Sequence, residues 1–266
     1  GCAYCRQYLR DRLGERFAAA ELAALYGGDP AAVADLRTPA AAAPSPLAAQ
    51  LRLQVDRWAH RRRKELFDEV LIDHGRALKP DLLLSQWYHK YDFGPQDERS
   101  LLPPGEWARA ESYIWYSQGG HKGESHLAHG WLADTGMPSR FIHAAGGGRP
   151  FITNKYDYRR LRLSIGEAAA NGAAALAFHV PGAIEAGDEL VRDEYLATVV
   201  RYEGFLAQHQ ELYHPARPWA SVALVYPRRE ELEAQADCLD ALKRAGRVME
   251  DNHVLFDIVL DDRAAE

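Results

Sequence analysis

The chain lacks the features that define several protein classes. Only three of its 266 residues are cysteines (Cys2, Cys5 and Cys238), too few for the disulfide framework of a small secreted domain. No apolar run reaches the roughly 18 residues of a membrane span. Residues 1–20 are charged and lack the apolar centre of a signal peptide. We therefore expect a cytoplasmic protein. Because an initiating methionine is also lacking, we expect its natural beginning to lie upstream of Gly1.

A concentrated basic surface is lacking as well. The formal net charge is −6, and the basic residues are scattered along the chain. Since nucleic-acid binding needs a concentrated positive surface, we expect no nucleic-acid partner. One basic run, residues 61–64, lies in a helical pattern and is followed by Glu65 and Asp68. This run predicts a solvated helix face with ion pairs.

The first third of the chain has the periodicity of helices. Residues 5–27 predict one helix that ends at Gly27-Gly28, and residues 38–47 form a linker rich in proline and alanine. A long helix is predicted over residues 47–78. The predicted apolar face of the first helix is formed by Leu9, Leu13, Phe17, Leu22 and Leu25. That of the second is formed by Leu51, Val55, Trp58, Leu66, Val70 and Leu71.

Short apolar strands then alternate with helices. The predicted strands cover residues 81–86, 107–115, 150–154 and 173–179, and the predicted helices cover residues 123–143, 158–171 and 188–211. Such alternation indicates a parallel sheet, and four such units are half of a (β/α)₈ barrel. A second α/β domain is predicted to begin after a boundary near residues 215–218. Its strands are residues 221–226 and 254–260, and its helix is residues 229–245.

Four segments carry a resemblance to a known family. They are the Cys2-Ala3-Tyr4-Cys5 cluster with the helix after it, the Arg149-Pro150-Phe151 strand opening, residues 163–178 and residues 220–226. In this order they resemble bacterial β-galactosidase-type glycoside hydrolases, and most closely a branch of hypothetical glycosyl hydrolases. The resemblance implies an α/β fold. Residues 1–214 would be the later half of a TIM barrel, and residues 215–266 an incomplete flavodoxin-like, trimerisation-type domain.

The same resemblance implies a partner and a metal. The substrate would be a carbohydrate, hydrolysed without a catalytic cofactor, and the chain would form a homo-oligomer. In the family the cysteine cluster can hold a structural zinc, so Cys2 and Cys5 are two candidate ligands of the four that a closed zinc site needs. Cys238 falls in a predicted helix and is expected to be a core residue.

The chain departs from the family at the catalytic residues. The family's acid/base glutamate follows an asparagine on the fourth barrel strand, a segment that would precede Gly1. Its nucleophile is a glutamate soon after the motif that Arg149-Pro150-Phe151 resembles. Here that stretch reads Ile152-Thr153-Asn154-Lys155, with no carboxylate before Asp157. Neither catalytic residue can therefore be transferred to this chain.

Three other carboxylates are candidates, because glycoside hydrolysis commonly needs two carboxyl groups at the carboxyl ends of barrel strands. Glu111 is expected near the carboxyl end of the second strand, Asp157 after the third and Asp92 in the loop after the first. An ion-paired glutamate in a loop is the competing interpretation of Glu111. If Glu111 is catalytic, Glu111→Gln lowers turnover by about a hundredfold or more.

Aromatic and polar residues are expected beside these carboxylates. Sugars stack their C–H faces on aromatic rings, so the aromatic pairs at two successive strand ends are candidate substrate-binding residues. Packing beneath the loops is the alternative. The candidates at the strand ends are Trp87, Tyr88, His89, Trp115, Tyr116, Asn154 and His179. Three further histidines, at positions 121, 126 and 129, lack the carboxylate spacing of a metal site.

Two alternatives to hydrolysis stay open. The absent glutamate favours a catalytically inactive carbohydrate-binding protein or interaction subunit. Nucleotide or flavin binding by the second domain is disfavoured, because residues 221–226 are not followed by a glycine-rich loop, and Gly146–Gly148 precede a strand and predict a turn.

Overall fold

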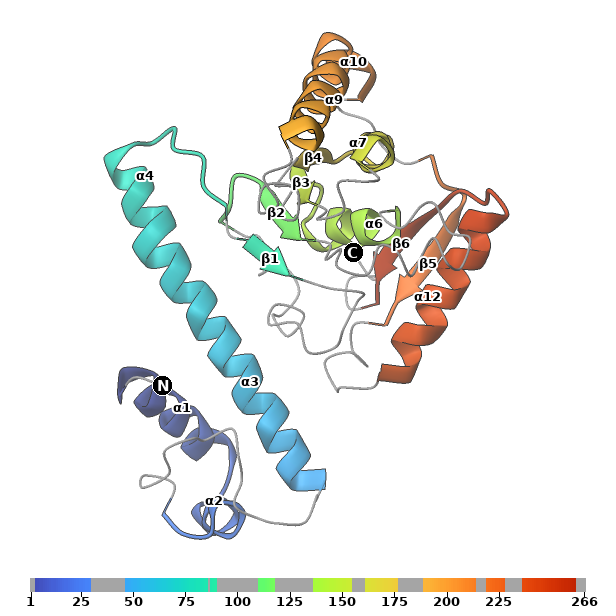
Figure 1. The fold of residues 1–266 in the computed structure, drawn as a ribbon. Helices are drawn as coiled ribbons and strands as arrows, with labels where there is room; N and C mark the ends of the chain where they lie inside the picture. Colours follow the sequence, from blue (N-terminus) through green and yellow to red (C-terminus); the bar gives the residue numbers. More distant parts are fainter. Residues whose placement is uncertain are drawn as a thin grey trace. The chain divides into compact units, whose positions relative to one another are not determined.

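The computed structural model describes residues 3–29, 46–85, 87–89, 110–117, 136–154, 161–176, 189–213, 219–227 and 236–261. In this part the protein is a mixed α/β structure, mostly helical, with short strands that all pair in parallel (Figure 1). The described residues fall into two compact units that divide between Leu82 and Leu83. The strands on both sides of the predicted boundary near residue 215 belong to the second unit, and the two predicted domains stay a prediction.

The first unit is helical. The predicted helix over 5–27 is two helices, α1 (Ala3–Arg16) and α2 (Ala19–Tyr26). The Glu21 carboxylate accepts a hydrogen bond from the Ala18 N–H (2.9 Å), which starts α2 as a separate helix. Gly27, at φ 69°, ends α2 in the left-handed conformation, as the glycine pair predicted. The predicted apolar face is confirmed, since all five of its residues belong to the core of this unit.

The long helix is confirmed, but only half of its predicted apolar face is. It consists of α3 (Pro46–Phe67), a π-helical segment (Asp68–Asp73) and α4 (His74–Leu78). Leu51 and Val55 are buried, whereas Val70 and Leu71 are about half exposed and Ile72 is buried instead. The i→i+5 bonding of a π-helix shifts the phase of the residues that follow, so a pattern of period 3.6 gives the wrong face there.

The basic run in α3 is less exposed than predicted. Arg62 pairs with Glu65 (3.0 Å), and its guanidinium lies over the Tyr4 ring, whose hydroxyl accepts a hydrogen bond from it (2.9 Å). Lys64 is buried and pairs with Asp68. The prediction of a solvated face was therefore wrong for Lys64, which sits one turn before the π-helical segment.

A four-stranded parallel sheet, here called the first sheet, lies in the second unit. Its strands are β1 (Trp87–His89), β2 (Ile114–Ser117), β3 (Phe151–Asn154) and β4 (Ala174–Leu176). They are paired in chain order, β1-β2-β3-β4, and the described part of the sheet does not close on itself. Helices α6 (Gly136–Ala145) and α7 (Leu161–Ala170) precede β3 and β4.

Two of the predicted strands lie elsewhere than expected. Residues 81–85 are not a strand, and β1 begins only at Trp87. Residues 110–113 precede β2. Between these segments two backbone N–H groups donate to serine hydroxyls: Ser112 Oγ accepts from the Leu84 N–H (3.2 Å) and Ser85 Oγ from the Trp115 N–H (3.1 Å). One backbone bond stands beside them, from the Ser112 N–H to the Leu84 carbonyl oxygen (2.8 Å). Such side-chain bonds compete with regular pairing, so both strands start later than their apolar patterns predicted.

The second sheet has two strands, β5 (Val222–Tyr226) and β6 (Phe256–Leu260), paired over all five positions. Helix α12 (Ala236–Asp251) connects them, and α9 (Glu189–Gln208) and α10 (Gln210–Tyr213) precede β5. These strands, α9 and α12 confirm the predicted order of elements. The turn at 146–148 is also confirmed, and Cys238 packs partly buried against the core as expected.

Helix α6 packs against both sheets. Phe141, Ile142 and Ala145 share one hydrophobic cluster with Ile114 and Phe151 of the first sheet. The same cluster includes Phe256, Ile258 and Leu260 of β6 and Tyr226 of β5, whose ring lies 4.6 Å from that of Phe141. Figure 1 shows α6 beside β6. The two sheets are therefore parts of one core.

No helix in the described ranges combines the length and apolarity needed to cross a bilayer.

Candidate functional site

The carboxyl ends of the strands of the first sheet are aligned. Trp87 is the register partner of Trp115, and Tyr88 is the partner of Tyr116. At the next position His89 aligns with Ser117, and Ser117 aligns with Asn154 on β3. Register partners on adjacent strands lie about 4.8 Å apart. The structure therefore brings six of the seven residues predicted at strand ends onto three neighbouring strands.

The two faces of this sheet differ in exposure. Ile114, Phe151 and Thr153 are buried on the face that packs against α6. Trp115 and Ile152, on the opposite face, are only partly buried. Positions alternate between faces along a strand. The positions of His89, Ser117 and Asn154 therefore share the more open face with Trp115 and Ile152, at its carboxyl edge.

Glu111 is not at this edge. It precedes β2, so the chain has to traverse the whole strand between Glu111 and Ser117. Its side chain is 4% exposed, and its Oε2 accepts a hydrogen bond from the Ala110 N–H (3.2 Å). The expectation that Glu111 lies near the carboxyl end of a strand was wrong, because β2 begins after it. The positional reason for a catalytic role of Glu111 is thereby lost.

Several candidates lie outside the described residues: Asp92, His121, His126, His129, Asp157, His179 and Cys2. Cys5 is described and half-buried in α1. Within the described ranges no three His, Cys, Asp or Glu side chains come together as metal ligands would. The zinc expectation for Cys2 and Cys5 stays a prediction.

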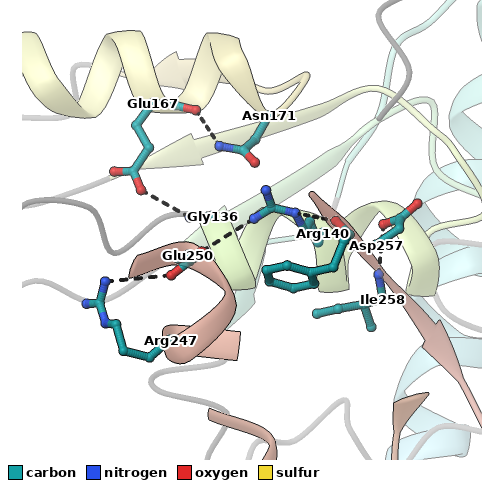
Figure 2. A network of polar contacts seen from close by, with 9 residues as sticks. Gly136, Arg140, Glu167, Asn171, Arg247, Glu250, Asp257 and Ile258 are labelled. Carbon is teal, nitrogen blue, oxygen red and sulfur yellow. Dashed lines mark hydrogen bonds and ion pairs between the residues drawn. The ribbon is translucent and has the colours of Figure 1, made fainter. Parts of the chain in front are cut away.

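Ser117 of the aligned edge and one polar network were not predicted from the sequence. Ser117 is the last residue of β2. The predicted strand ended at residue 115, two residues earlier, so Ser117 was not expected at a strand end. The polar network joins α6, α7, α12 and β6 (Figure 2). Arg140, Glu167 and the Arg247–Glu250 pair are far apart in the sequence, so no local pattern could have revealed the whole network.

Arg140 is central to this network. Its Nε donates to the Phe256 carbonyl oxygen (3.0 Å), and its guanidinium lies 4.5 Å from the centre of the Phe256 ring. Arg140 also pairs with Glu250 (3.4 Å), and Arg247 pairs with the other Glu250 oxygen (3.6 Å). Glu167 accepts a hydrogen bond from the Gly136 N–H (3.1 Å) at the start of α6. The network thus fastens α6 to its neighbours.

Burial raises the pKa of two glutamates. Desolvation raises the pKa of Glu250 above its ordinary value, although the positive charges of Arg140 and Arg247 oppose this. Glu167 and Asp251 act in the same direction as burial. Burial also raises the pKa of Glu203 in α9. Perturbed carboxyl groups can mark functional sites, but Glu250 is held by two arginines, which is typical of a structural ion-pair network.

Comparison with known proteins gives no match: no family model, no curated protein and no solved structure matches the chain.

Proposed function

We propose that the protein is a glycoside hydrolase of the β-galactosidase type, which cleaves O-glycosidic bonds by carboxylate acid/base chemistry. It would be a cytoplasmic homo-oligomer that needs no catalytic cofactor. In this proposal the first sheet is part of a (β/α)₈ barrel and the second sheet begins a flavodoxin-like domain.

The alignment of the two aromatic pairs is the observation that carries the proposal. Trp87 and Tyr88 are paired in register with Trp115 and Tyr116 near the carboxyl ends of adjacent parallel strands. In α/β proteins ligands bind at the carboxyl ends of the strands. The positions of Trp87 and Trp115 share a face with those of His89, Ser117 and Asn154, a composition that suits stacking on a sugar and binding its hydroxyl groups, whereas the positions of Tyr88 and Tyr116 align with Thr153 on the α6 face.

The strand order also supports the barrel. Four parallel strands follow one another without a reversal. Residues of α6 and α7 contribute to one cluster on a single face of the sheet. Barrels place all their helices on the outer face and keep the strands in chain order. A doubly wound sheet reverses its strand order at the switch point, and no reversal occurs among these four strands.

The catalytic carboxylate that best fits this edge is Asp157. It follows Asn154, the last residue of β3, within three positions of the chain. Asp157→Asn is expected to lower kcat by about a hundredfold or more on an aryl β-galactoside, because it removes an acid/base or nucleophilic group.

The test compares two tryptophans. Trp115→Leu should raise KM by about tenfold, the effect of losing roughly 1.4 kcal/mol of ring contact with the sugar. Trp219→Leu is the matched control, since Trp219 is 91% exposed and lies just before β5 in the second sheet. Equal effects of the two changes, or no turnover and no sugar binding by the unaltered chain, would contradict the proposal.

A catalytically inactive carbohydrate-binding protein is the second candidate. It is favoured because Glu111, the carboxylate expected at the edge, lies before β2. Saturable binding of galactosides by the unaltered chain, with no turnover of any aryl glycoside in a panel, would select this candidate over the hydrolase.

A further inference from the structure

We propose that Ser117 binds a hydroxyl group of the saccharide and discriminates between sugars that carry or lack that hydroxyl. This inference rests on the proposed function, because it assigns a further residue to the same carboxyl edge. It concerns a polar residue of the edge for which the sequence pattern predicted no role.

The register places Ser117 between two candidate residues. Its partner on β1 is His89, and its partner on β3 is Asn154. Since adjacent strands are about 4.8 Å apart, the three backbone positions span about 10 Å across three strands. A pyranose ring with its hydroxyl groups is somewhat smaller than this span. A sugar over the middle strand would therefore lie at the position of Ser117.

Ser117 lies at the end of its strand and on the same face as Trp115. It is the last residue of β2, as His89 is of β1 and Asn154 is of β3. By alternation it shares a face with Trp115 and not with the buried Ile114. On the α6 face, the neighbouring strand carries Thr153, another hydroxyl residue that is 4% exposed. The position of Thr153 thus lies on the buried face, and the position of Ser117 lies on the more open one.

The chemistry of the row suits a polyhydroxylated ligand. A serine hydroxyl is one donor and two acceptor positions, an asparagine amide offers both kinds of group, and a neutral imidazole offers one of each. Sugar hydroxyls also donate and accept together. A site that hydrogen-bonds a substrate hydroxyl rejects the analogue that lacks it, because its own polar groups are then left without partners.

The experiment measures the binding of galactose and its monodeoxy analogues by calorimetry. The unaltered chain should bind galactose about tenfold more tightly than one particular monodeoxy analogue, the effect of one net hydrogen bond. Ser117→Ala should bind these two sugars equally and leave the other preferences unchanged. Ser117→Thr, which keeps the hydroxyl, should keep the discrimination.

Thr153→Val is the matched control, because it removes a hydroxyl from the opposite, buried face and should leave every preference unchanged. If Ser117→Ala does not fold, Ser117→Cys provides the same comparison with a nearly isosteric, weakly bonding group. A uniform loss of affinity for all the sugars, or no change, would overturn the role of Ser117 while the proposed function stands. No binding of any sugar by the unaltered chain would overturn both.

Discussion

The two sheets of the second unit are built differently, although both are parallel. The second sheet pairs five residues on each strand, and β6 buries alternate residues, Phe256, Ile258 and Leu260. The first sheet has strands of three or four residues that end in histidine, serine, asparagine and leucine. The longer strands contribute apolar side chains to the core, and the shorter ones bring polar residues to an edge.

Within the part of the chain that the structure describes, β6 pairs with β5 on one side only. Some backbone groups on its other side also have partners. The Asp261 N–H donates to the Tyr226 carbonyl oxygen (3.1 Å). In a parallel pair the backbone groups of alternate residues face the neighbouring strand, so those of Asp257 and Asp261 face β5, and those of Phe256 and Ile258 point away from it. These outward groups have partners: the Phe256 carbonyl accepts from Arg140 (3.0 Å) and the Ile258 N–H donates to Asp257 (2.8 Å). Unpaired edges invite pairing with other chains, and these two bonds occupy part of this side of β6. We infer that the second sheet mainly supports the fold, and the function proposed above is assigned to the first sheet.

Removal of a large side chain from the second sheet should have the largest effect on stability. Phe256 is 1% exposed and contacts the Arg140 guanidinium. Phe256→Ala should lower the free energy of unfolding by about 3–5 kcal/mol, because it leaves a cavity in the shared core. Urea unfolding followed by tryptophan fluorescence measures this. Ser117→Ala should cost less than about 0.5 kcal/mol. Similar costs for the two variants would contradict the division of roles between the sheets.

Two glycines test how tightly α6 and α12 are packed. A Cβ at Gly146 would meet the Ile114 side chain and the Ile142 carbonyl oxygen (2.9 Å). Because backbone cannot yield, Gly146→Ala should cost about 2 kcal/mol. A Cβ at Gly246 would meet only the flexible Met137 side chain. Alanine gains about 1 kcal/mol over glycine in a helix, so Gly246→Ala should change stability by less than about 1 kcal/mol. Thermal unfolding of both variants checks the order, and a larger cost at Gly246 would contradict it.

Local patterns predicted most of the elements, and the failures have local causes. The strand over 221–226 was predictable because its apolar residues form one continuous run, and the long helix before residue 68 because its apolar residues recur at helical spacing. Val70 and Leu71 were misplaced because a π-helical segment, which changes the phase, has no signature in hydrophobic spacing. β1 and β2 were misplaced because two backbone N–H groups before or at the start of the strands donate to serine hydroxyls, and an apolar run does not reveal such bonds.

The candidate site was predictable in composition but not in alignment. Trp115 and Tyr116 follow an apolar stretch, so their place near a strand end could be read from the sequence. Their pairing with Trp87 and Tyr88, and the place of Ser117 between His89 and Asn154, depend on register. A shift of one residue would move every one of these positions to the other face, and the sequence pattern of strands this short does not determine their register.

The smallest predicted effect concerns the network that joins α6 and α12. Burial raises the pKa of Glu250, so the folded protein holds this proton more strongly than the unfolded chain, in which the pKa is about 4.3. The stabilising contribution of Glu250 is then fully present below about pH 4.3 and is lost as the pH rises through the higher folded value.

Glu250→Gln should remove this dependence, so the stability of the unaltered chain relative to the variant should fall as the pH rises. Arg247→Met should enlarge that fall, because Arg247 lowers the Glu250 pKa. Urea unfolding at a series of pH values measures both differences. If the relative stability of the unaltered chain rose with pH instead, the attraction of Arg140 and Arg247 would outweigh the cost of burial, and the network would be an ordinary stabilising ion-pair cluster.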